Sequence, residues 1–237
     1  MDLLVKGAAE LDLRLTPGQV ESFRVYHREL VTWNQRMNLT AIVDSEGAQV
    51  RHFLDSLTVA RVLTDPVRDH GRMLDVGAGA GFPGLPLKLM FPGMHLSMLD
   101  SVGKKTSFLE HLVETLELED VDIYNGRAED LAMRPELRES FDVVVSRGVA
   151  RMRVLMEYTL PYCRIGGIVV TLKKGGIEPE VSDALHAMEV LAGRIREMRG
   201  VTVDGLEDGR ALVVVDKVKP TPAKFPRRPG LPTKRPL

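Results

Sequence analysis

Hydrophobic positions between residues 71 and 218 follow two periods that alternate along the chain. Short apolar runs predict buried strands, and the segments between them place apolar residues three and four positions apart, as an amphipathic helix does. This alternation is typical of an α/β domain whose parallel sheet is covered on both faces. The predicted strands are 73–76, 94–100, 121–124, 141–145, 166–172, 201–203 and 211–218, and the predicted helices are 85–91, 102–116, 154–163 and 178–194.

Helical spacing of apolar residues also marks the start of the chain. Thr16, followed by a proline, has the form of a helix N-cap, and a second helix is expected to begin near Asp44. In that second helix Arg51 and Asp55 are one turn apart and form a predicted surface pair. We predict a helical extension over residues 1–70, with no chemistry of its own that the sequence reveals.

The last segment, residues 219–237, differs in composition from the rest. It holds six prolines and several basic residues but no acidic one. Prolines at this density exclude a helix or a central strand. The segment is either a solvated linker or a basic arm that binds a polyanion. We therefore predict three parts: the helical extension, an α/β domain over 71–218, and this basic tail.

Length and charge set further bounds. A chain of 237 residues allows one large domain or a core domain with a small appendage. The formal net charge of −1 means that any contact with nucleic acid must depend on local basic clusters. No apolar run reaches the ~20 residues of a membrane span, and the start lacks the pattern of a signal peptide. A single cysteine, Cys163, fits a reducing compartment, so we expect a cytoplasmic protein without membrane contact.

The most informative stretch is residues 73–84, which read Met-Leu-Asp-Val-Gly-Ala-Gly-Ala-Gly-Phe-Pro-Gly. An apolar run enters a turn rich in glycine, and a helical pattern follows. A strand, a glycine turn and a helix in this order hold nucleotide-like ligands at the carboxyl edge of a parallel sheet. Glycine suits the turn because it permits positive φ and lets the backbone come close to a ligand.

Two ligands compete for this turn. Gly79, Gly81 and Gly84 match the dinucleotide pattern G-x-G-x-x-G. The D-x-G-x-G-x-G pattern of S-adenosylmethionine (SAM) binders overlaps it and begins at Asp75 and Gly77. Asp75 favours SAM, because a carboxylate repels a pyrophosphate but suits the sulfonium and ammonium of SAM. Asp75 could instead only cap the turn through the backbone.

Polar residues follow the other predicted strands at the same edge. Asp100, 25 positions after Asp75, ends the second strand, where an acid can accept both ribose hydroxyls or cap the next helix. Beyond the third strand the backbone of Ala128 and a carboxylate from Glu129 or its neighbour could pair with an adenine edge, although this is also an ordinary polar loop. Arg147 follows the fourth strand, where its guanidinium could grip the donor's carboxylate or an RNA phosphate.

Several of these segments together resemble one family, the bacterial RsmG family, also called GidB. Its members are small-subunit ribosomal RNA guanine-N7 methyltransferases, and the resemblance extends from about residue 20 to the end of the chain. It rests on Asn-Leu-Thr at 38–40, Arg-His-Phe-Leu-Asp-Ser-Leu at 51–57, the glycine turn at 75–84, Leu-Asp-Ser at 99–101, Arg-Ala-Glu at 127–129, Ser-Arg-Gly-Val-Ala at 146–150 and the tail.

The resemblance implies a Rossmann-like SAM-dependent methyltransferase fold with a mostly parallel, seven-stranded sheet. It also implies that SAM is the cofactor and that the substrate is N7 of a guanine in the 16S rRNA loop beside the decoding centre, as free RNA or in an assembling small subunit. By carry-over, Gly77 and Phe82 line the donor, Ala128 and Glu129 meet the adenine, and Arg147 closes the pocket. The full expected donor site is Asp75, Gly77, Gly79, Gly81, Phe82, Asp100, Ala128, Glu129 and Arg147.

Guanine N7 already carries a lone pair, so its methylation requires no prior removal of a proton. Such an enzyme can work by holding nucleophile, methyl and sulfur in line, and we expect neither a general base nor a metal. Arg147 and Lys173 are candidates for positioning the substrate, and His52 is expected to be structural. The alternatives are an NAD-dependent oxidoreductase that uses the overlapping glycine pattern and a non-catalytic RNA-binding protein of the same fold.

Overall fold

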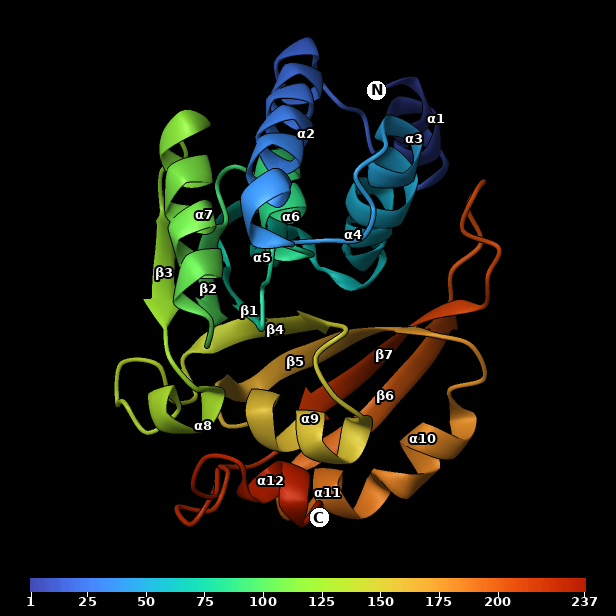
Figure 1. The fold of residues 1–237 in the computed structure, drawn as a ribbon. Helices are drawn as coiled ribbons and strands as arrows, with labels where there is room; N and C mark the ends of the chain where they lie inside the picture. Colours follow the sequence, from blue (N-terminus) through green and yellow to red (C-terminus); the bar gives the residue numbers. More distant parts are fainter.

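A seven-stranded sheet forms the centre of the structure, a computed structural model that describes residues 1–237 (Figure 1). The strand order is β3-β2-β1-β4-β5-β7-β6, and only β7 runs antiparallel to its neighbours. The predicted α/β fold with a mostly parallel sheet is confirmed. The strands are β1 (Arg72–Val76), β2 (His95–Asp100), β3 (Val121–Asn125), β4 (Phe141–Arg147), β5 (Cys163–Lys174), β6 (Gly193–Gly200) and β7 (Arg210–Lys217).

The order of the parallel strands reverses between β1 and β4. The chain passes from β1 to β2 and β3 on one side, and then returns to β4 and β5 on the other. At such a reversal the loops after the two strands diverge, and a crevice opens at the carboxyl ends of the strands. The glycine turn after β1 and the loop after β4 both lie at this point.

Helices cover both faces of the sheet. In Figure 1 helices α1 to α7 lie above the sheet and α8 to α12 lie below it. The helices are α1 (Asp2–Glu10), α2 (Pro17–Met37), α3 (Ser45–Gly47), α4 (Asp55–Leu57), α5 (Asp65–His70), α6 (Gly84–Met90), α7 (Gly103–Thr115), α8 (Ala128–Leu131), α9 (Met152–Thr159), α10 (Glu178–Asp183), α11 (Leu185–Val190) and α12 (Leu231–Lys234).

Successive residues of each strand supply two separate cores. Met73 packs into the upper cluster, and its neighbour Leu74 packs into the lower one. The upper cluster runs from Leu4 in α1 to Val214 in β7, so the N-terminal helices share one hydrophobic core with the sheet. Burial on both faces explains why the central strands are apolar throughout.

The helical segment after Asp44 is less regular than predicted. Asp44 does cap its start, because its Oδ1 accepts a hydrogen bond from the Gly47 amide at 2.7 Å. The π-helix η1 (Ala48–Leu54) then follows, and after α4 the segment ends in the 3₁₀ helix η2 (Thr58–Val62). The predicted surface pair of Arg51 with Asp55 is wrong. Asp55 is only 2% exposed, because the wider turns of η1 direct it into the interior.

Two other predictions fail near the C-terminal side of the sheet. The helix predicted over 178–194 is two short helices, α10 and α11, and the strand predicted at 201–203 lies earlier, as β6. The exposed face of β6 carries charged side chains, as is common on edge strands, and these charges obscure the strand's alternation of apolar and polar residues in the sequence. The helix predicted to reach Cys163 ends at Thr159, and Cys163 begins β5.

The prediction that the tail forms no helix is also wrong, because α12 lies within it. Gly230 precedes this helix with φ of 78°, and Pro232 falls in its first turn, where the missing N–H costs nothing. The tail packs against the lower half of the molecule, near α9 and α11 (Figure 1). Phe225 within it is only 4% exposed.

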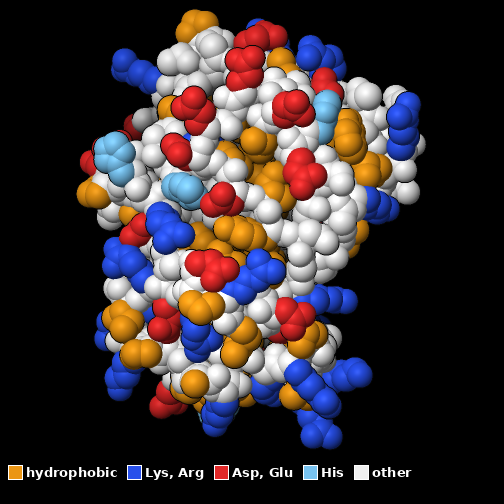
Figure 2. All heavy atoms as spheres, turned by 90° about the vertical axis from the view of Figure 1, so that its left-hand side faces the viewer, with side chains coloured by type: hydrophobic (Ala, Val, Ile, Leu, Met, Phe, Trp, Pro, Cys, Tyr) orange, Lys and Arg blue, Asp and Glu red, His pale blue; other side chains and the backbone are white.

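Charge is not spread evenly over the surface. Figure 2 views the edge of the sheet that holds β3, and basic side chains gather in the lower half of that view. The same half contains α8, α9 and α12 in Figure 1. No helix is both long and apolar enough to cross a membrane.

Candidate functional site

A cavity of about 700 Å³ lies at the carboxyl ends of β1, β2, β3 and β4. This volume falls within the range of ~300–1,000 Å³ that is usual for small-molecule sites. The cavity occupies the crevice expected where the strand order reverses. Four predicted site residues meet in its wall: Gly77, Asp100, Ala128 and Glu129. Gly148, which follows the predicted residue Arg147, also lines it.

The glycine turn forms one side of the cavity. Gly77 has φ of 74°, and a Cβ at this position would stand 2.6 Å from Cγ2 of Val149, in the loop after β4. The amides of Gly77 and Ala78 both donate to the carbonyl of Leu99 in β2, at 2.9 and 3.0 Å. Glycine is therefore required for a conformation and for a close approach, as the sequence indicated.

Asp100 joins the glycine turn to the start of α7. Its Oδ2 accepts the Gly79 amide at 3.0 Å, and its Oδ1 accepts the Val102 amide at 2.9 Å. Lys105 Nζ lies 3.6 Å from Oδ2, and the aspartate is 5% exposed. Asp100 therefore lines the cavity and holds the backbone just before α7, whereas the helix itself receives no side-chain cap. Its contact with a ribose stays a prediction.

Ala128 and Glu129 lie at the start of α8, on the opposite wall. Tyr162 donates its hydroxyl to the carbonyl of Ala128 at 2.6 Å, which fixes this turn. Glu129 is 4% exposed, and its Oε1 accepts the backbone amide of Gly230, in the tail, at 2.9 Å. The segment predicted to meet an adenine is thus held from behind by two distant parts of the chain.

Asp75 lies behind the glycine turn rather than in the cavity wall. Its side chain is fully buried, and its Oδ2 accepts the Gly84 amide at 2.8 Å. Its Oδ1 has no hydrogen-bond partner. Burial raises the pKa of Asp75 to about 7, and the Gly84 amide opposes this rise. The structure therefore favours the role of turn cap, which the sequence had left as the second interpretation of this residue.

Phe82 and Arg147 meet on the side of the glycine turn that faces the N-terminal helices. The Phe82 ring stacks on His52, with centroids 4.5 Å apart, and on Tyr26, at 5.4 Å. The guanidinium carbon of Arg147 lies 4.8 Å from the Phe82 centroid. Neither Phe82 nor Arg147 lines the cavity. Gly81 also faces this side, where a Cβ would stand 2.5 Å from the Tyr26 hydroxyl.

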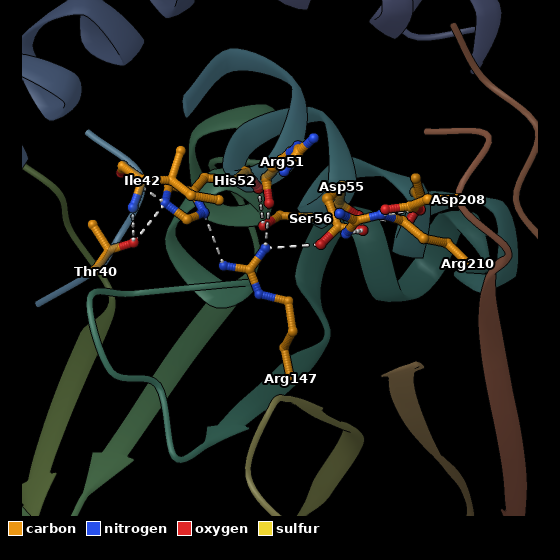
Figure 3. A network of polar contacts seen from close by, with 10 residues as sticks. Thr40, Ile42, Arg51, His52, Asp55, Ser56, Arg147, Asp208 and Arg210 are labelled. Carbon is orange, nitrogen blue, oxygen red and sulfur yellow. Dashed lines mark hydrogen bonds and ion pairs between the residues drawn. The ribbon is translucent and has the colours of Figure 1, made fainter. Parts of the chain in front are cut away.

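Arg147 belongs to a polar network that joins β4 to the π-helix and to β7 (Figure 3). It donates to Asp55 Oδ2 at 2.8 Å and to the carbonyl of Arg51 at 3.0 Å. The other oxygen of Asp55 lies 2.6 Å from Nη1 of Arg210. His52 contacts the same guanidinium at 3.5 Å, and burial, followed by the Arg147 charge, lowers the pKa of His52 to about 4. His52 is therefore neutral at neutral pH, as a structural histidine would be.

Lys173 is engaged within the protein. Its ammonium donates to the carbonyl of Ala150 at 2.9 Å and to Glu180 Oε1 at 2.7 Å. Glu180 Oε1 also accepts the amide of Met152 at 2.7 Å. Lys173 thereby fixes the far end of the loop after β4, and that loop contributes Gly148 and Val149 to the cavity.

Sequence reasoning missed the floor and the rim of the cavity. The floor comes from α9, which gives Arg153, Val154 and Tyr158, and the rim comes from Thr233 and Pro236 in the tail. The α9 residues recur at helical spacing, which only signals an amphipathic helix. Nothing in the tail's composition distinguishes a rim from a solvated arm.

Relatives of one description match the chain over its whole length. The family model described as rRNA small subunit methyltransferase G matches residues 19–203. A protein named ribosomal RNA small subunit methyltransferase G from Dehalococcoides mccartyi is 45% identical over 237 residues, which is 100% of both chains. A Roseiflexus protein of the same name is 46% identical with the same coverage. One from Lactobacillus delbrueckii is 41% identical and covers 100% of this chain and 99% of its own.

Solved structures of methyltransferases share the fold. TYW2 of M. jannaschii, in complex with AdoMet, aligns with a TM-score of 0.55 and 15% identity, over 74% of this chain and 76% of that chain. A SAM-dependent methyltransferase from Aquifex aeolicus aligns with a TM-score of 0.55 and 16% identity, over 72% and 93% respectively. At these identities the likeness lies in the fold alone.

Proposed function

Because this chain belongs to the rRNA small subunit methyltransferase G family, we propose that it methylates N7 of a guanine in 16S rRNA, in the loop beside the decoding centre. It is a SAM-dependent methyltransferase with a Rossmann-like fold. The observation that carries the proposal is the full-length identity to these methyltransferases, together with the cavity at the sheet's reversal point.

The residues of the cavity fit an adenosyl donor. We propose that Asp100 accepts the ribose hydroxyls, since each of its oxygens binds one backbone amide and keeps further acceptor capacity, even with Lys105 beside Oδ2. Ala128 and Glu129 offer a backbone group and a carboxylate edge to an adenine. Gly77 carries no side chain, so that a ligand can lie against the backbone of the turn. When bound, SAM supplies an electrophilic methyl group on a sulfonium.

The protein contributes to the reaction by positioning the guanine and the methyl donor relative to each other. Guanine N7 presents a lone pair, so no proton has to be removed before methyl transfer, and holding the reactants in line is sufficient. Tyr158, the cavity's tyrosine, has its pKa raised by burial and stays protonated at neutral pH. His52 lies outside the cavity. We therefore assign no general base.

We propose that Arg147 and Lys173 are positioning residues for the loop after β4. Arg147 anchors the beginning of the loop to the π-helix, and Lys173 holds its end through the carbonyl of Ala150. Gly148 and Val149 between them form the cavity wall. Arg147 would thus act on the donor site through this loop and through Phe82, whereas Asp75, Gly79 and Gly81 would act through the glycine turn.

Basic side chains at the cavity mouth support an RNA partner. Lys105, Arg127 and Arg151 all contribute to the lining, and both arginines are exposed. Such charges can pair with phosphates beside the target base, although the net charge of the whole chain is −1. A ribosomal RNA substrate, free or in an assembling small subunit, places the reaction in the cytoplasm.

The direct test is to incubate the protein with labelled SAM and unmodified 16S rRNA or small subunits. Reduction and aniline cleavage then map N7-methylguanine along the RNA. We expect one labelled guanine, beside the decoding centre. Label on another atom or another region of the RNA would contradict the proposal.

A pair of glycine variants tests the donor site itself. Gly77→Ala forces a Cβ against Val149 at positive φ, whereas Gly200→Ala adds a Cβ where nothing lies within 4 Å. Calorimetric titration should show SAM affinity about tenfold weaker in Gly77→Ala, equivalent to ~1.4 kcal/mol, and unchanged in Gly200→Ala. Equal affinities in the two variants would remove the glycine turn from the donor site.

A further inference from the structure

The tail is held to the domain along its length, before it reaches the cavity. Arg138 donates to the carbonyl of Thr221 at 3.0 Å and to the carbonyl of Phe225 at 2.9 Å. The Thr221 amide donates to Glu139 at 2.6 Å. Backbone groups held at fixed positions over several residues describe an ordered segment, not a solvated linker.

A buried ion pair anchors the middle of the tail. Glu157 in α9 has no exposed surface, and Arg227 donates to both of its oxygens through Nε, at 2.9 and 3.1 Å, and through Nη2, at 2.6 Å. The Arg227 backbone amide adds a fourth hydrogen bond at 2.7 Å. A bidentate arginine–carboxylate pair fixes direction as well as distance. The chain that follows is therefore aimed along α9, toward the cavity.

Beyond this anchor the tail reaches the site. The Gly230 amide donates to Glu129 Oε1 at 2.9 Å, and the hydroxyls of Tyr158 and Thr233 lie 3.0 Å apart. Thr233 and Pro236 then contribute to the cavity lining. The Glu129 carboxylate makes no other hydrogen bond in the protein, so its Oε2 remains able to accept one from a ligand. The tail thus contacts the residue assigned to the adenine and also forms part of the opening beside it.

We infer that residues 227–237 are a positioning segment of the donor site, which forms its adenosine-side rim and orients Glu129 through the Gly230 amide. The inference rests on the proposed function, because it takes the ligand to be an adenosyl donor. It differs from the sequence-based expectation that the tail is an RNA-binding arm. Under the inference, the tail's backbone and its Thr233 and Pro236 contacts raise donor affinity, and its charges are not needed for this.

The basic charges of the tail can be separated from its contacts. Arg228, Lys234 and Arg235 are exposed and make no ion pair, whereas Arg227 is engaged with Glu157. Neutralising Arg228, Lys234 and Arg235 removes charge but leaves the rim in place. Removing residues 231–237 deletes the rim but keeps the Arg227 anchor and the Gly230 contact. These two changes form a matched pair.

The experiment measures donor affinity by calorimetric titration with SAM and with S-adenosylhomocysteine, and RNA affinity over a series of salt concentrations. The variant lacking 231–237 should bind both donors about tenfold more weakly, since the lost contacts lie at their common adenosine end. The triple Arg228→Gln, Lys234→Gln, Arg235→Gln variant should bind both donors as the full chain does. A milder Thr233→Ala, Pro236→Ala variant should show the same direction of change if the truncated chain does not fold.

Three results would overturn the inference. The first is unchanged donor affinity in both the truncated chain and the double alanine variant. The second is a loss for SAM but not for S-adenosylhomocysteine, which would place the contact at the methyl instead of the adenosine. The third is a loss of RNA affinity and salt dependence in the triple variant with intact donor affinity in the truncation, as expected of an RNA arm. Failure of the unmodified chain to bind SAM would instead refute the proposed function.

Discussion

Asp75 and His52 both lie near Arg147, and burial shifts their pKa values in opposite directions. Burial raises the pKa of the Asp75 carboxyl to about 7 and lowers that of the His52 imidazole to about 4. Both shifts favour the neutral form, because a charge is costly in a desolvated site. The shell behind the glycine turn is therefore nearly neutral at its centre, although Arg147 and Asp55 form an ion pair at its edge.

The buried carboxyl gives a pH-dependent prediction. A folded pKa of about 7 against an ordinary 3.8 means that the folded state holds a proton that the unfolded state has released. Stability from Asp75 therefore falls as pH rises from about 4 to 7, by roughly 4 kcal/mol at most. Asp75→Asn keeps an acceptor for the Gly84 amide and removes this titration. In urea unfolding, the free energy of unfolding of the variant should rise progressively relative to that of the parent chain between pH 4.5 and 7.

His52→Gln is the control for the sign of that effect. The folded pKa of His52 is depressed, so its contribution to stability is present above pH 6.5 and is lost as pH falls toward 4. The free energy of unfolding of His52→Gln, relative to that of the parent chain, should therefore fall as pH rises over the same window. Parallel pH profiles for the two variants would show that neither group titrates as described.

Residue by residue, the sequence predicted the cavity wall better than the network behind it. Gly77 and Asp100 belong to local patterns of strand, turn and spacing, so their placement follows from a few neighbouring residues. The contact of Arg147 with Asp55 joins positions 92 apart in the chain, and no local pattern encodes it. The Phe82 ring stacks on His52 in the upper core, and its predicted contact with the donor stays a prediction.

At the scale of elements, the loop after β4 is held at both ends. Arg147 ties its beginning to η1, and Lys173 in β5 ties its end to α10 through Glu180. Two rigid supports of this kind reduce the conformational freedom of the residues between them, and those residues form the cavity wall. The loop's position is thus set by elements that make no contact with a ligand.

Adjacent lysines in β5 test this arrangement. Lys173→Met leaves the Ala150 carbonyl and the half-buried Glu180 without their donor, at an expected loss of about 1–3 kcal/mol in the free energy of unfolding. Lys174→Met removes only an exposed pair with Asp208 and should change stability by less than ~0.5 kcal/mol. Methyl transfer should also fall in the first variant and not in the second. If Lys173→Met and Lys174→Met had similar free energies of unfolding and similar methyl-transfer rates, Lys173 would have no special role in holding the loop.

Elements were predictable where burial makes the pattern simple. The parallel strands from β1 to β5 are apolar and bounded by turn residues, and each was found within a few positions. The edge strand β6 carries Arg194 and Arg196, which pair with Asp216 of β7, so its charged alternation resembled a polar helix end. The π-helical turns of η1 also leave no mark in the spacing of its apolar residues, because they depend on tertiary packing.

At the scale of the molecule, the N-terminal helices and the sheet share one hydrophobic core. Their side chains form a single cluster from α1 to β7, and Trp33 of α2 packs on Phe108 of α7, with ring centroids 5.6 Å apart. A boundary at residue 70 divides the sequence by element type but does not divide this core. The same continuity places η1 against the glycine turn and lets the extension support the site.

A shared core predicts one cooperative unfolding transition. Trp33, the chain's single tryptophan, reports on the contact between the extension and the sheet, whereas far-ultraviolet circular dichroism reports on the whole fold. The two signals should give coincident urea midpoints. A fragment of residues 71–237 should fail to fold, since it exposes the upper core. An earlier fluorescence transition, with a stable fragment, would instead establish the extension as a separate domain.

Under the inference that Thr233 and Pro236 form the adenosine-side rim, an inhibitor built on adenosine would gain contacts with both residues through a substituent on its adenine edge. The glycine turn and the ribose acid belong to a fold that hosts many methyltransferases, and compounds that bind these features alone would discriminate poorly. Thr233 and Pro236 lie beyond residues 19–203, the part of the chain that the family model matches. Chemical selectivity against other methyltransferases of this fold is therefore best sought at the rim that Thr233 and Pro236 form.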